Sequence, residues 1–374
     1  MKTIKTISIS VLSISILFLA GCPRQLQYQG MLGFPNYPKH TEAEPFTFAV
    51  AGDSQGTFTQ INKEVLWRVM DDIQFRDSNT AFTVVTGDMI HGSSDSQVAM
   101  RAMQEWQEIV TSHFHAPIVP VCGNHEIQTE KTQEVYRQLF GSHVPQNGPE
   151  DERGLSYYFD YNRCRFIVID TAFYGDMYRV RHIDWLENVI KTARPAGVNH
   201  IFVFGHIPAW PVAHIKNSLP NAANAINGET SSLDATRRFW NLLKEYRVDA
   251  YFCGHEHVYA RQNVGGVWQI NTCSAGAGLG TINPGYPGTG ASQKAKDAFE
   301  ANKPYYEILG YPTGAGSNGQ AGTQFVGASV FNYVLVDVLS SGVRLRMYGV
   351  KETDSLGLNF ELMDQFELSP VPVK

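Results

Sequence analysis

Beyond residue 44, short apolar runs alternate with segments of helical periodicity. Residues 46–51, 81–86 and 117–122 are rich in apolar and β-branched residues, which is typical of buried strands. In residues 61–73 and 97–110 the apolar positions recur every three or four residues, which indicates helices with one buried face. This alternation predicts βαβ units with parallel strands.

The later part of the chain contains more strands in succession. Residues 155–160 and 164–170 are apolar runs that flank Tyr161-Asn162-Arg163, and they indicate a β-hairpin. Further periodic segments predict helices at residues 182–192 and 234–246 and strands at 200–204, 249–253, 267–272, 331–338 and 343–348. A chain that is α/β early and β-rich late predicts mixed sheets rather than one parallel sheet.

The N-terminus has the pattern of an export signal. Residues 1–21 contain two lysines, an apolar stretch and then small residues, which is the layout of a signal peptide. The ending Leu19-Ala20-Gly21-Cys22 resembles the lipobox of bacterial lipoproteins, in which Cys22 would carry the lipid; an ordinary cleavage site is the alternative. We expect an exported protein, lipid-anchored to a bacterial membrane and facing the periplasm or the cell exterior, with residues 22–44 as a tether.

One folded domain is expected from residue 45 to residue 350, with inserts at residues 211–235 and 274–327. The second insert is rich in Gly, Pro, Asn and Tyr, which favours an ordered lid or a wall of the substrate site. Residues 351–374 are expected to form a C-terminal tail that packs on this domain.

Composition and charge exclude several classes of protein. A chain of 374 residues that is 43% hydrophobic and 18% charged can bury a large core, so it is neither disordered nor fibrous. No apolar run of membrane-spanning length occurs after the N-terminus, which excludes a multi-span membrane protein. With 30 basic against 36 acidic residues there is no positive excess to hold a phosphate backbone, so nucleic acid is not expected as a bulk partner. The only expected membrane contact is the lipid anchor, and the oligomeric state is not predicted.

Four cysteines lie inside or at the end of strand-like runs: Cys122, Cys164, Cys253 and Cys273. A domain of this size does not need disulfides for stability, so we expect buried free thiols. A disulfide between Cys253 and Cys273 is the alternative.

The candidate ligand and catalytic residues stand just after the predicted strands. Five times an apolar run ends in glycine followed directly by Asp, Asn or His: Gly52-Asp53, Gly87-Asp88, Gly123-Asn124, Gly205-His206 and Gly254-His255. Any one of these pairs alone is most often a turn. Ligands of open α/β sheets bind at the carboxyl ends of the strands, so we expect the five side chains to converge at one edge. Carboxylates and imidazoles together suit Mn, Zn or Fe, and a carboxylate can bridge two such ions.

This set, closed by Gly254-His255-Glu256-His257, resembles the calcineurin-like metallophosphoesterase superfamily. The similarity is greatest to the purple acid phosphatase branch, on the segments 157–161, 166–171, 204–208 and 253–261. The resemblance implies an α/β fold, a four-layer αββα sandwich of two mixed β-sheets flanked by helices, with the metal site at one sheet edge. It also implies two metal ions, Mn, Zn or Fe.

The same resemblance implies a ligand set. Asp88 would bridge both ions. Asn124, His206 and His255 would complete one site, and Asp53 and His257 would bind the other ion.

The chain departs from the family pattern at the first metal site. The usual histidine two residues after the first aspartate is Gln55 here, and purple acid phosphatases instead use a tyrosine three residues after the bridging aspartate. Because His91 stands three residues after Asp88, we predict that His91 takes this ligand position; a surface loop histidine is the alternative. Gln55 would then be a weak ligand, a hydrogen-bond donor behind the ligands or a substrate contact. Without the tyrosine, no purple colour is expected.

The implied reaction is hydrolysis of a phosphate ester by a hydroxide that two metal ions activate. His125 is expected to protonate the leaving group and Glu126 to orient that imidazole; a purely structural His125 is the alternative. His214 could contact the substrate phosphate, with a solvated loop histidine as the alternative. Arg261 could also bind the phosphate, with a structural ion pair as the alternative. Phosphomonoesters are favoured as substrates, the alternatives being a phosphodiesterase or nucleotidase activity on the same site, or a non-catalytic surface-binding lipoprotein.

Overall fold

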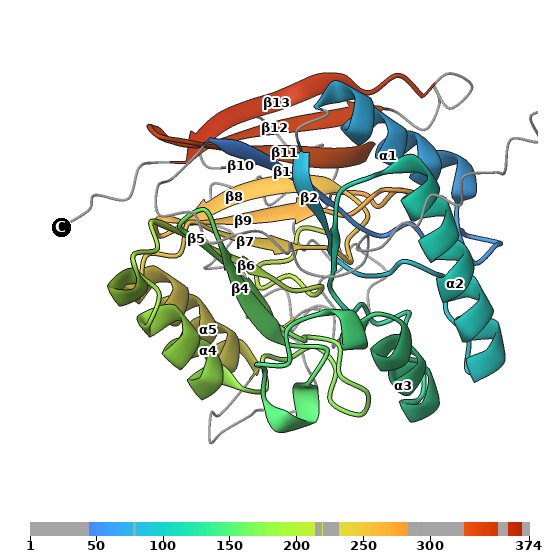
Figure 1. Ribbon diagram of the computed structural model, residues 1–374, viewed down its shortest axis with the longest axis horizontal. Coiled ribbons are helices and arrows are strands. Elements are labelled where there is room, and N and C mark those ends of the chain that lie inside the picture. The colour runs from blue at the N-terminus through green and yellow to red at the C-terminus, as the bar shows by residue number, and fades with distance from the viewer. Residues whose placement is uncertain are drawn as a thin grey trace, which may run out of the picture.

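Two mixed β-sheets pack face to face, with helices on their outer faces (Figure 1). The computed structural model describes residues 45–77, 80–213, 219, 232–282, 293, 325–350 and 358–368. The expected signal segment 1–21, the tether 22–44, Cys22, His214 and most of the two inserts lie outside the described residues.

The first sheet has the strand order β13-β12-β11-β1-β2-β3. Its members are β1 (Phe46–Ala51), β2 (Thr80–Val85), β3 (Ile118–Pro120), β11 (Phe331–Leu339), β12 (Gly342–Val350) and β13 (Glu361–Leu368). β1, β2 and β3 run parallel, and β11 pairs with β1 in the antiparallel direction. The sheet is therefore mixed, with its parallel half built by the βαβ units at the start of the domain.

The second sheet has the order β10-β8-β9-β7-β6-β5-β4. Its members are β4 (Tyr157–Tyr161), β5 (Cys164–Val168), β6 (His200–Phe204), β7 (Ala250–Cys253), β8 (Tyr259–Val264), β9 (Val267–Thr272) and β10 (Phe325–Ala328). The central strands β5, β6, β7 and β9 are parallel, whereas β4 and β8 pair antiparallel to their neighbours. The expected hairpin forms at β4 and β5, where Asn162 and Arg163 adopt the left-handed backbone of a tight turn.

Three apolar clusters correspond to the three interfaces between layers. The helices α1 (Lys63–Arg76), α2 (Ser96–His113) and α3 (Glu130–Leu139) contribute Leu66, Trp106 and Tyr136 to the cluster on the first sheet. α4 (Ile183–Lys191) and α5 (Ser232–Glu245) pack similarly on the second sheet. Between the sheets lie stacked and edge-on phenylalanines, including Phe48, Phe82, Phe166 and Phe202. The expected four-layer sandwich of two mixed sheets is confirmed.

Apart from three short 3-10 helices among the described residues, the sequence did not lead us to expect one helix and three strands: α3, β8, β10 and β13. β13 lies in the segment expected as a C-terminal tail and forms the edge strand of the first sheet, paired with β12. It is joined to the second sheet through Asp364, whose carboxylate accepts hydrogen bonds from Arg261 at 2.6 Å and from Tyr259 at 2.7 Å. This segment therefore links the two sheets.

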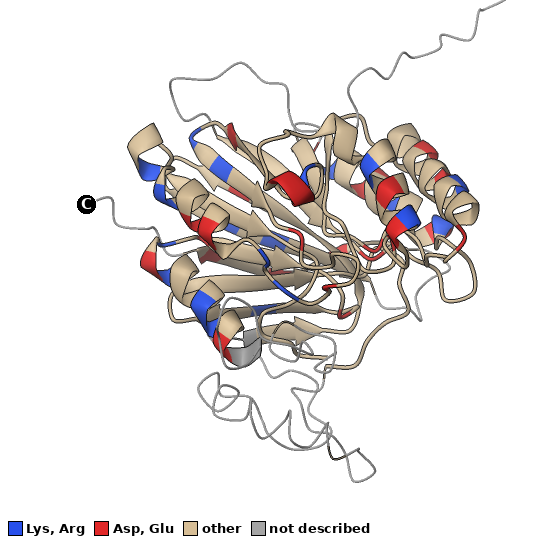
Figure 2. Cartoon of the chain, turned by 90° about the horizontal axis from the view of Figure 1, so that it is seen from below, with Lys and Arg blue, Asp and Glu red and all other residues tan. Residues whose placement is uncertain are grey.

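The four cysteines expected as free thiols are free and buried. This confirms the expectation and excludes the alternative disulfide between Cys253 and Cys273. In the described part of the chain, no helix combines the length and the apolar character that crossing a bilayer requires. Acidic and basic residues are interspersed along the outer helices (Figure 2).

Candidate metal centre

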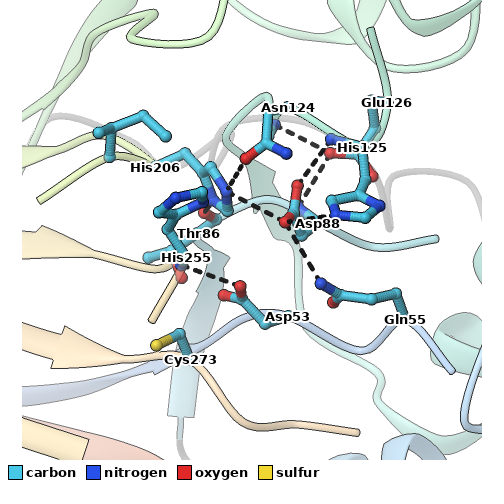
Figure 3. Close-up of polar contacts among 12 residues, drawn as sticks. Asp53, Gln55, Thr86, Asp88, Asn124, His125, Glu126, His206, His255 and Cys273 are labelled. Carbon is cyan, nitrogen blue, oxygen red and sulfur yellow. Dashed lines mark hydrogen bonds and ion pairs between the residues drawn. The ribbon is translucent and has the colours of Figure 1, made fainter. Parts of the chain in front are cut away.

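The expected ligands converge where five strands end. The loops that follow β1, β2, β3, β6 and β7 carry Asp53, Asp88, Asn124, His206 and His255, and their side chains point toward one another (Figure 3). His257 joins them from the loop between β7 and β8. All of these strands belong to the parallel parts of the two sheets, so their carboxyl ends share one edge.

The backbone of this edge is unusually constrained. Eight non-glycine residues of the described chain have a positive φ, and four of them are expected ligands: Asp53 at 55°, Asp88 at 50°, His255 at 76° and His257 at 54°. Left-handed backbone is unfavourable for residues with a side chain and tends to be retained at functional sites. The backbone of these four residues is therefore locally strained, and this conformation directs their side chains toward one point.

Glycines allow the loops to approach closely. A Cβ at Gly123 would lie 2.2 Å from the backbone nitrogen of Asp88, and one at Gly254 would lie 2.5 Å from Oδ2 of Asp53. No other residue fits at either position without moving a ligand. The glycines before Asn124 and His255 are thus required by contact between loops.

Two groups of side chains offer ligand atoms to one ion each. The atoms of Asp88, His206 and His255 lie within 4.8 Å of one another, and so do those of Asp53, Asp88 and His257. Asp88 belongs to both groups, which is the arrangement that a bridging carboxylate needs. Oδ1 of Asn124 lies 3.0 Å from Nε2 of His206, so this amide stands beside the first group.

Backbone groups fix the direction of four of the expected ligands. Nδ1 of His206 donates to the carbonyl oxygen of Thr86 at 2.7 Å, and Nδ1 of His257 donates to that of Gly278 at 2.9 Å. Both histidines therefore present Nε2 to the site. The carboxylates are held similarly, since Oδ1 of Asp88 accepts from the backbone nitrogen of His125 and Oδ1 of Asp53 from that of His255, both at 2.9 Å.

The buried carboxylates of the site would be stabilised by a nearby positive charge. Burial raises the pKa of Asp53 well above its usual range, because desolvation outweighs the attraction of His206. Burial alone would also raise the pKa of Asp88, but the charge and hydrogen bond of His206 hold it well below its usual range. Burial alone would lower the pKa of His206, yet the attraction of Asp88 raises it to about 10. A divalent cation would stabilise both carboxylates in their charged form.

Two buried oxygens support the fit of a metal ion. Oδ2 of Asp53 and Oε1 of Gln55 are buried and have no hydrogen-bond partner. An unsatisfied buried oxygen is costly in a folded protein, and a metal ion is one partner that such an oxygen can take. The donor set of carboxylates, imidazoles and amides is one that Mn, Zn and Fe accept.

Gln55, rather than His91, lies beside the donors of the first metal site. The ring of His91 is not among either group of ligand atoms; it lies against the ring of His125, with centroids 5.5 Å apart. Gln55 instead occupies this side, with Nε2 at 3.3 Å from Oδ2 of Asp88 and 3.0 Å from Nε2 of His257. His91 therefore lies outside the two donor groups, and its role as a ligand stays a prediction, while Gln55 is the residue that contacts Asp88 and His257 on this side.

His91 acts on the site through its backbone. Its carbonyl oxygen accepts from Nδ1 of His125 at 2.5 Å, which leaves Nε2 of His125 facing the centre, 3.8 Å from Oδ2 of Asp88. The expectation that Glu126 orients this imidazole is thus wrong. The carboxylate of Glu126 is fully buried and accepts from the backbone nitrogens of Gly123, Asp88, Met89 and Ile90. Glu126 holds the ligand loops together.

Arg261 is a structural residue. It pairs with Asp364 and stacks on the ring of Phe366, at 4.3 Å from the ring centroid, which is the structural ion pair given as the alternative to a phosphate contact. His214 lies outside the described residues.

Two supporting residues were missed at the sequence level. Glu256 sits between the two histidines of the last motif, and its Oε1 accepts from the backbone nitrogens of Val212 and Ala213. Thr171 accepts from the backbone nitrogen of His206 through Oγ1 at 3.1 Å. Glu256 mirrors Glu126, because each follows a histidine of a metal motif and turns inward. Its position directly after a histidine of a metal motif is the signal that could have identified Glu256, whereas no such pattern marks Thr171.

The fold and the converging donors define a class of α/β sandwich proteins with a metal site at a sheet edge. The family model described as calcineurin-like phosphoesterase matches residues 46–259, more than half of the chain. The chain therefore belongs to the calcineurin-like phosphoesterase family. The expected family is confirmed.

The individual relatives share a low sequence identity with this chain. An uncharacterised protein of Mycobacterium tuberculosis is 27% identical over 198 residues, which are 49% of this chain and 35% of that protein. The serine/threonine-protein phosphatase CPPED1 of Danio rerio is 25% identical over 206 residues, 53% of this chain and 61% of that protein. The chain thus spans less than two thirds of the length of either relative. The purple acid phosphatase PPD1 from yellow lupin (Lupinus luteus) seeds shares the fold, with a TM-score of 0.59, 13% identity and coverage of 88% of this chain and 55% of that chain.

Proposed function

We propose that this protein hydrolyses phosphate esters, with phosphomonoesters as the favoured substrates, at a centre that holds two divalent ions. The observation that carries the proposal is that two groups of ligand atoms share Asp88. The phosphatase name of the Danio rerio relative supports the preference for monoesters. When bound, the two ions supply the Lewis-acid charge that activates water and offsets the negative charge of the phosphoryl group.

The residues of the chain perform the remaining tasks. Asp53, Asp88 and His257 would hold one ion, and Asp88, Asn124, His206 and His255 the other, with Gln55 as a neutral neighbour of the first. His125 points Nε2 at the centre from a fixed ring position and has 29% of its side chain exposed. It is therefore placed to give a proton to the leaving oxygen of a substrate that enters from solvent.

Two alternatives use the same geometry. A phosphodiesterase or nucleotidase would need the same ions and proton donor, because specificity resides in the residues around the centre. A non-catalytic surface-binding protein would keep the scaffold without turnover. Gln55, a weaker ligand than the usual histidine, favours this second alternative.

Hydrolysis assays with metal analysis separate these functions. The purified protein, supplied in turn with Mn, Zn and Fe(II), is expected to bind two ions and to hydrolyse p-nitrophenyl phosphate faster than the corresponding diester. Asp88→Asn should lower kcat/KM by about 10³-fold, whereas the exposed control Asp184→Asn should leave it unchanged. Faster hydrolysis of the diester would reassign the substrate class. Two bound ions without turnover of either ester would favour the binding protein.

We also propose that the protein is exported and anchored by a lipid on Cys22. The support is the sequence of residues 1–22, which combines an export signal with the lipobox-like ending. Expressed in a bacterium with a radiolabelled fatty acid, the wild-type chain should incorporate label and sediment with membranes. Cys22→Ser should do neither, and an unlabelled wild-type chain would refute the anchor.

A further inference from the structure

Tyr178 lies in the loop between β5 and α4 and has the same backbone conformation as the expected ligands. Its φ is 66°, which makes it one of the eight described non-glycine residues with a positive φ. A bulky residue in left-handed backbone is a genuine outlier. The other three such residues outside the ligand set are Asn162, Arg163 and Arg247. Two of them form the β4–β5 turn, so Tyr178 stands out as a strained aromatic residue.

The loop of Tyr178 is fastened to the metal centre. Its backbone nitrogen donates to the carbonyl oxygen of Thr171 at 2.8 Å. The hydroxyl of the same Thr171 accepts from the backbone nitrogen of His206 at 3.1 Å. One residue therefore holds both a histidine of the centre and the strained tyrosine, which fixes their relative positions.

The ring of Tyr178 packs on a ligand. Its centroid lies 5.9 Å from that of His255, at an interplanar angle of 59°. The side chain is half-buried. A phenol is a hydrogen-bond donor at neutral pH, so the hydroxyl of Tyr178 can donate to an anionic oxygen.

We propose that Tyr178 is a substrate-binding residue whose hydroxyl donates a hydrogen bond to a phosphoryl oxygen of the ester at the metal centre. The position explains why the strain is retained, because a phenol beside His255 places a neutral donor next to the oxygens that the ions would hold. A neutral donor adds affinity for a phosphoryl group without competing for the ions. The proposal rests on the proposed phosphoesterase function for its substrate.

Tyr178→Phe tests this role because it removes only the hydroxyl and keeps the ring on His255. Inorganic phosphate is the probe, titrated calorimetrically into the metal-loaded protein, alongside kinetics with p-nitrophenyl phosphate. Loss of one hydrogen bond should weaken phosphate binding and lower kcat/KM by about tenfold each. The metal content should stay unchanged. Tyr174→Phe is the matched control, since Tyr174 lies in the same loop and is 41% exposed, and it should behave as wild type.

The outcomes separate this role from the proposed function. Weaker phosphate binding in Tyr178→Phe would support the role even if the wild-type protein hydrolyses neither ester, in which case only the phosphoesterase function fails. Unchanged phosphate affinity and kcat/KM would overturn the role of Tyr178 while the function stands. A loss of bound metal in Tyr178→Phe would show that the tyrosine supports the ligands instead, which also overturns the proposal. A wild-type protein that binds metal but no phosphate would contradict both.

Discussion

At the scale of single residues, backbone groups rather than charged side chains hold most of the expected ligands. Asp53 and Asp88 each accept a backbone N–H from a neighbouring ligand loop, and His206 and His257 each donate to a carbonyl oxygen. This arrangement leaves the opposite atom of each side chain for a cation. The ligands are therefore oriented by the fold itself, before any ion binds.

Glu126 is predicted to be a structural residue. Glu126→Gln replaces an oxygen that accepts backbone N–H groups by an NH₂ group that cannot, and should lower the free energy of unfolding by about 1–3 kcal/mol. Urea unfolding of the metal-loaded protein measures this loss. Glu134→Gln, an exposed change on α3, should have no effect. Unchanged stability together with a shifted pH profile of kcat would restore the expected role of Glu126 in orienting His125.

The four described thiols are predicted to be inert in the native protein. Each is buried, and burial raises the pKa of every one of them well above its usual range, so little thiolate forms at neutral pH. Iodoacetamide should label none of them within minutes in the folded protein and all four in denaturant, as mass spectrometry of the peptides would show. A peptide that stays unlabelled after unfolding would reveal a disulfide.

Residue roles could be predicted from the sequence only where the motif is local. Asp53, Asp88 and the three histidines follow strands directly, so their convergence depends only on the strand ends meeting. The choice between Gln55 and His91 depends on which way two loops face. That direction is set by backbone hydrogen bonds, such as the one from the nitrogen of His91 to the carbonyl oxygen of Gln60, which leave no trace in the sequence pattern.

At the scale of elements, strands and helices with a continuous apolar signal were predictable and polar ones were not. β1 has the bounds that the pattern predicted, because all but its first two residues are buried. The buried face of α3 includes the polar residues Thr132 and Gln133, so the sequence shows no apolar stripe there. β13 is an edge strand with mostly exposed or half-buried residues, and its pairing with β12 replaces the missing apolar signal.

The loop after β3 is predicted to tolerate no side chain at Gly123. In Gly123→Ala the added carbon would lie 2.2 Å from the backbone nitrogen of Asp88, so the Asp88 loop must move and metal content should fall with activity. Mass spectrometry of bound metal measures the loss. In Gly175→Ala the added carbon meets nothing within 4 Å. The left-handed backbone alone should then lower the free energy of unfolding by about 1 kcal/mol, without loss of metal. Full metal content in Gly123→Ala would contradict this account.

A buried acidic pair near the short helix η2 (Glu150–Glu152) predicts a pH dependence of stability. Burial and the charge of Asp170 raise the pKa of Glu152 from 4.5 to about 8, and burial raises that of Asp170 from 3.8 to about 6. Ser156, Arg181 and His182 also face Glu152. Because the folded pKa values exceed the unfolded ones, the stabilisation is present below about pH 4 and is lost as the pH rises through 6 to 8.

Unfolding free energies measured from pH 4 to pH 8.5 test this pair. Each proton involved contributes a slope of at most about 1.4 kcal/mol per pH unit, so the wild-type protein should lose stability across this window. Glu152→Gln should flatten the dependence, and the exposed control Glu150→Gln should retain it. An equally steep decline in Glu152→Gln would show that other groups cause it.

At the scale of the whole molecule, two sheets built from separate parts of the chain both contribute residues to the candidate metal centre at one edge. The first sheet supplies Asp53, Asp88 and Asn124, and the second supplies His206, His255 and His257. Ions bound between them would join the two sheets, so their removal should affect both. The fold class could be predicted because α/β alternation and late strands are visible in the pattern, whereas the pairing of β13 is not.

The most direct test of the central claim is a crystal structure of the metal-loaded protein with anomalous diffraction collected at the absorption edge of the bound metal. The account predicts two anomalous peaks bridged by Asp88, one also contacting His206 and His255 and the other also contacting Asp53 and His257. Peaks elsewhere in the molecule, or a single peak that Asp88 does not touch, would contradict it.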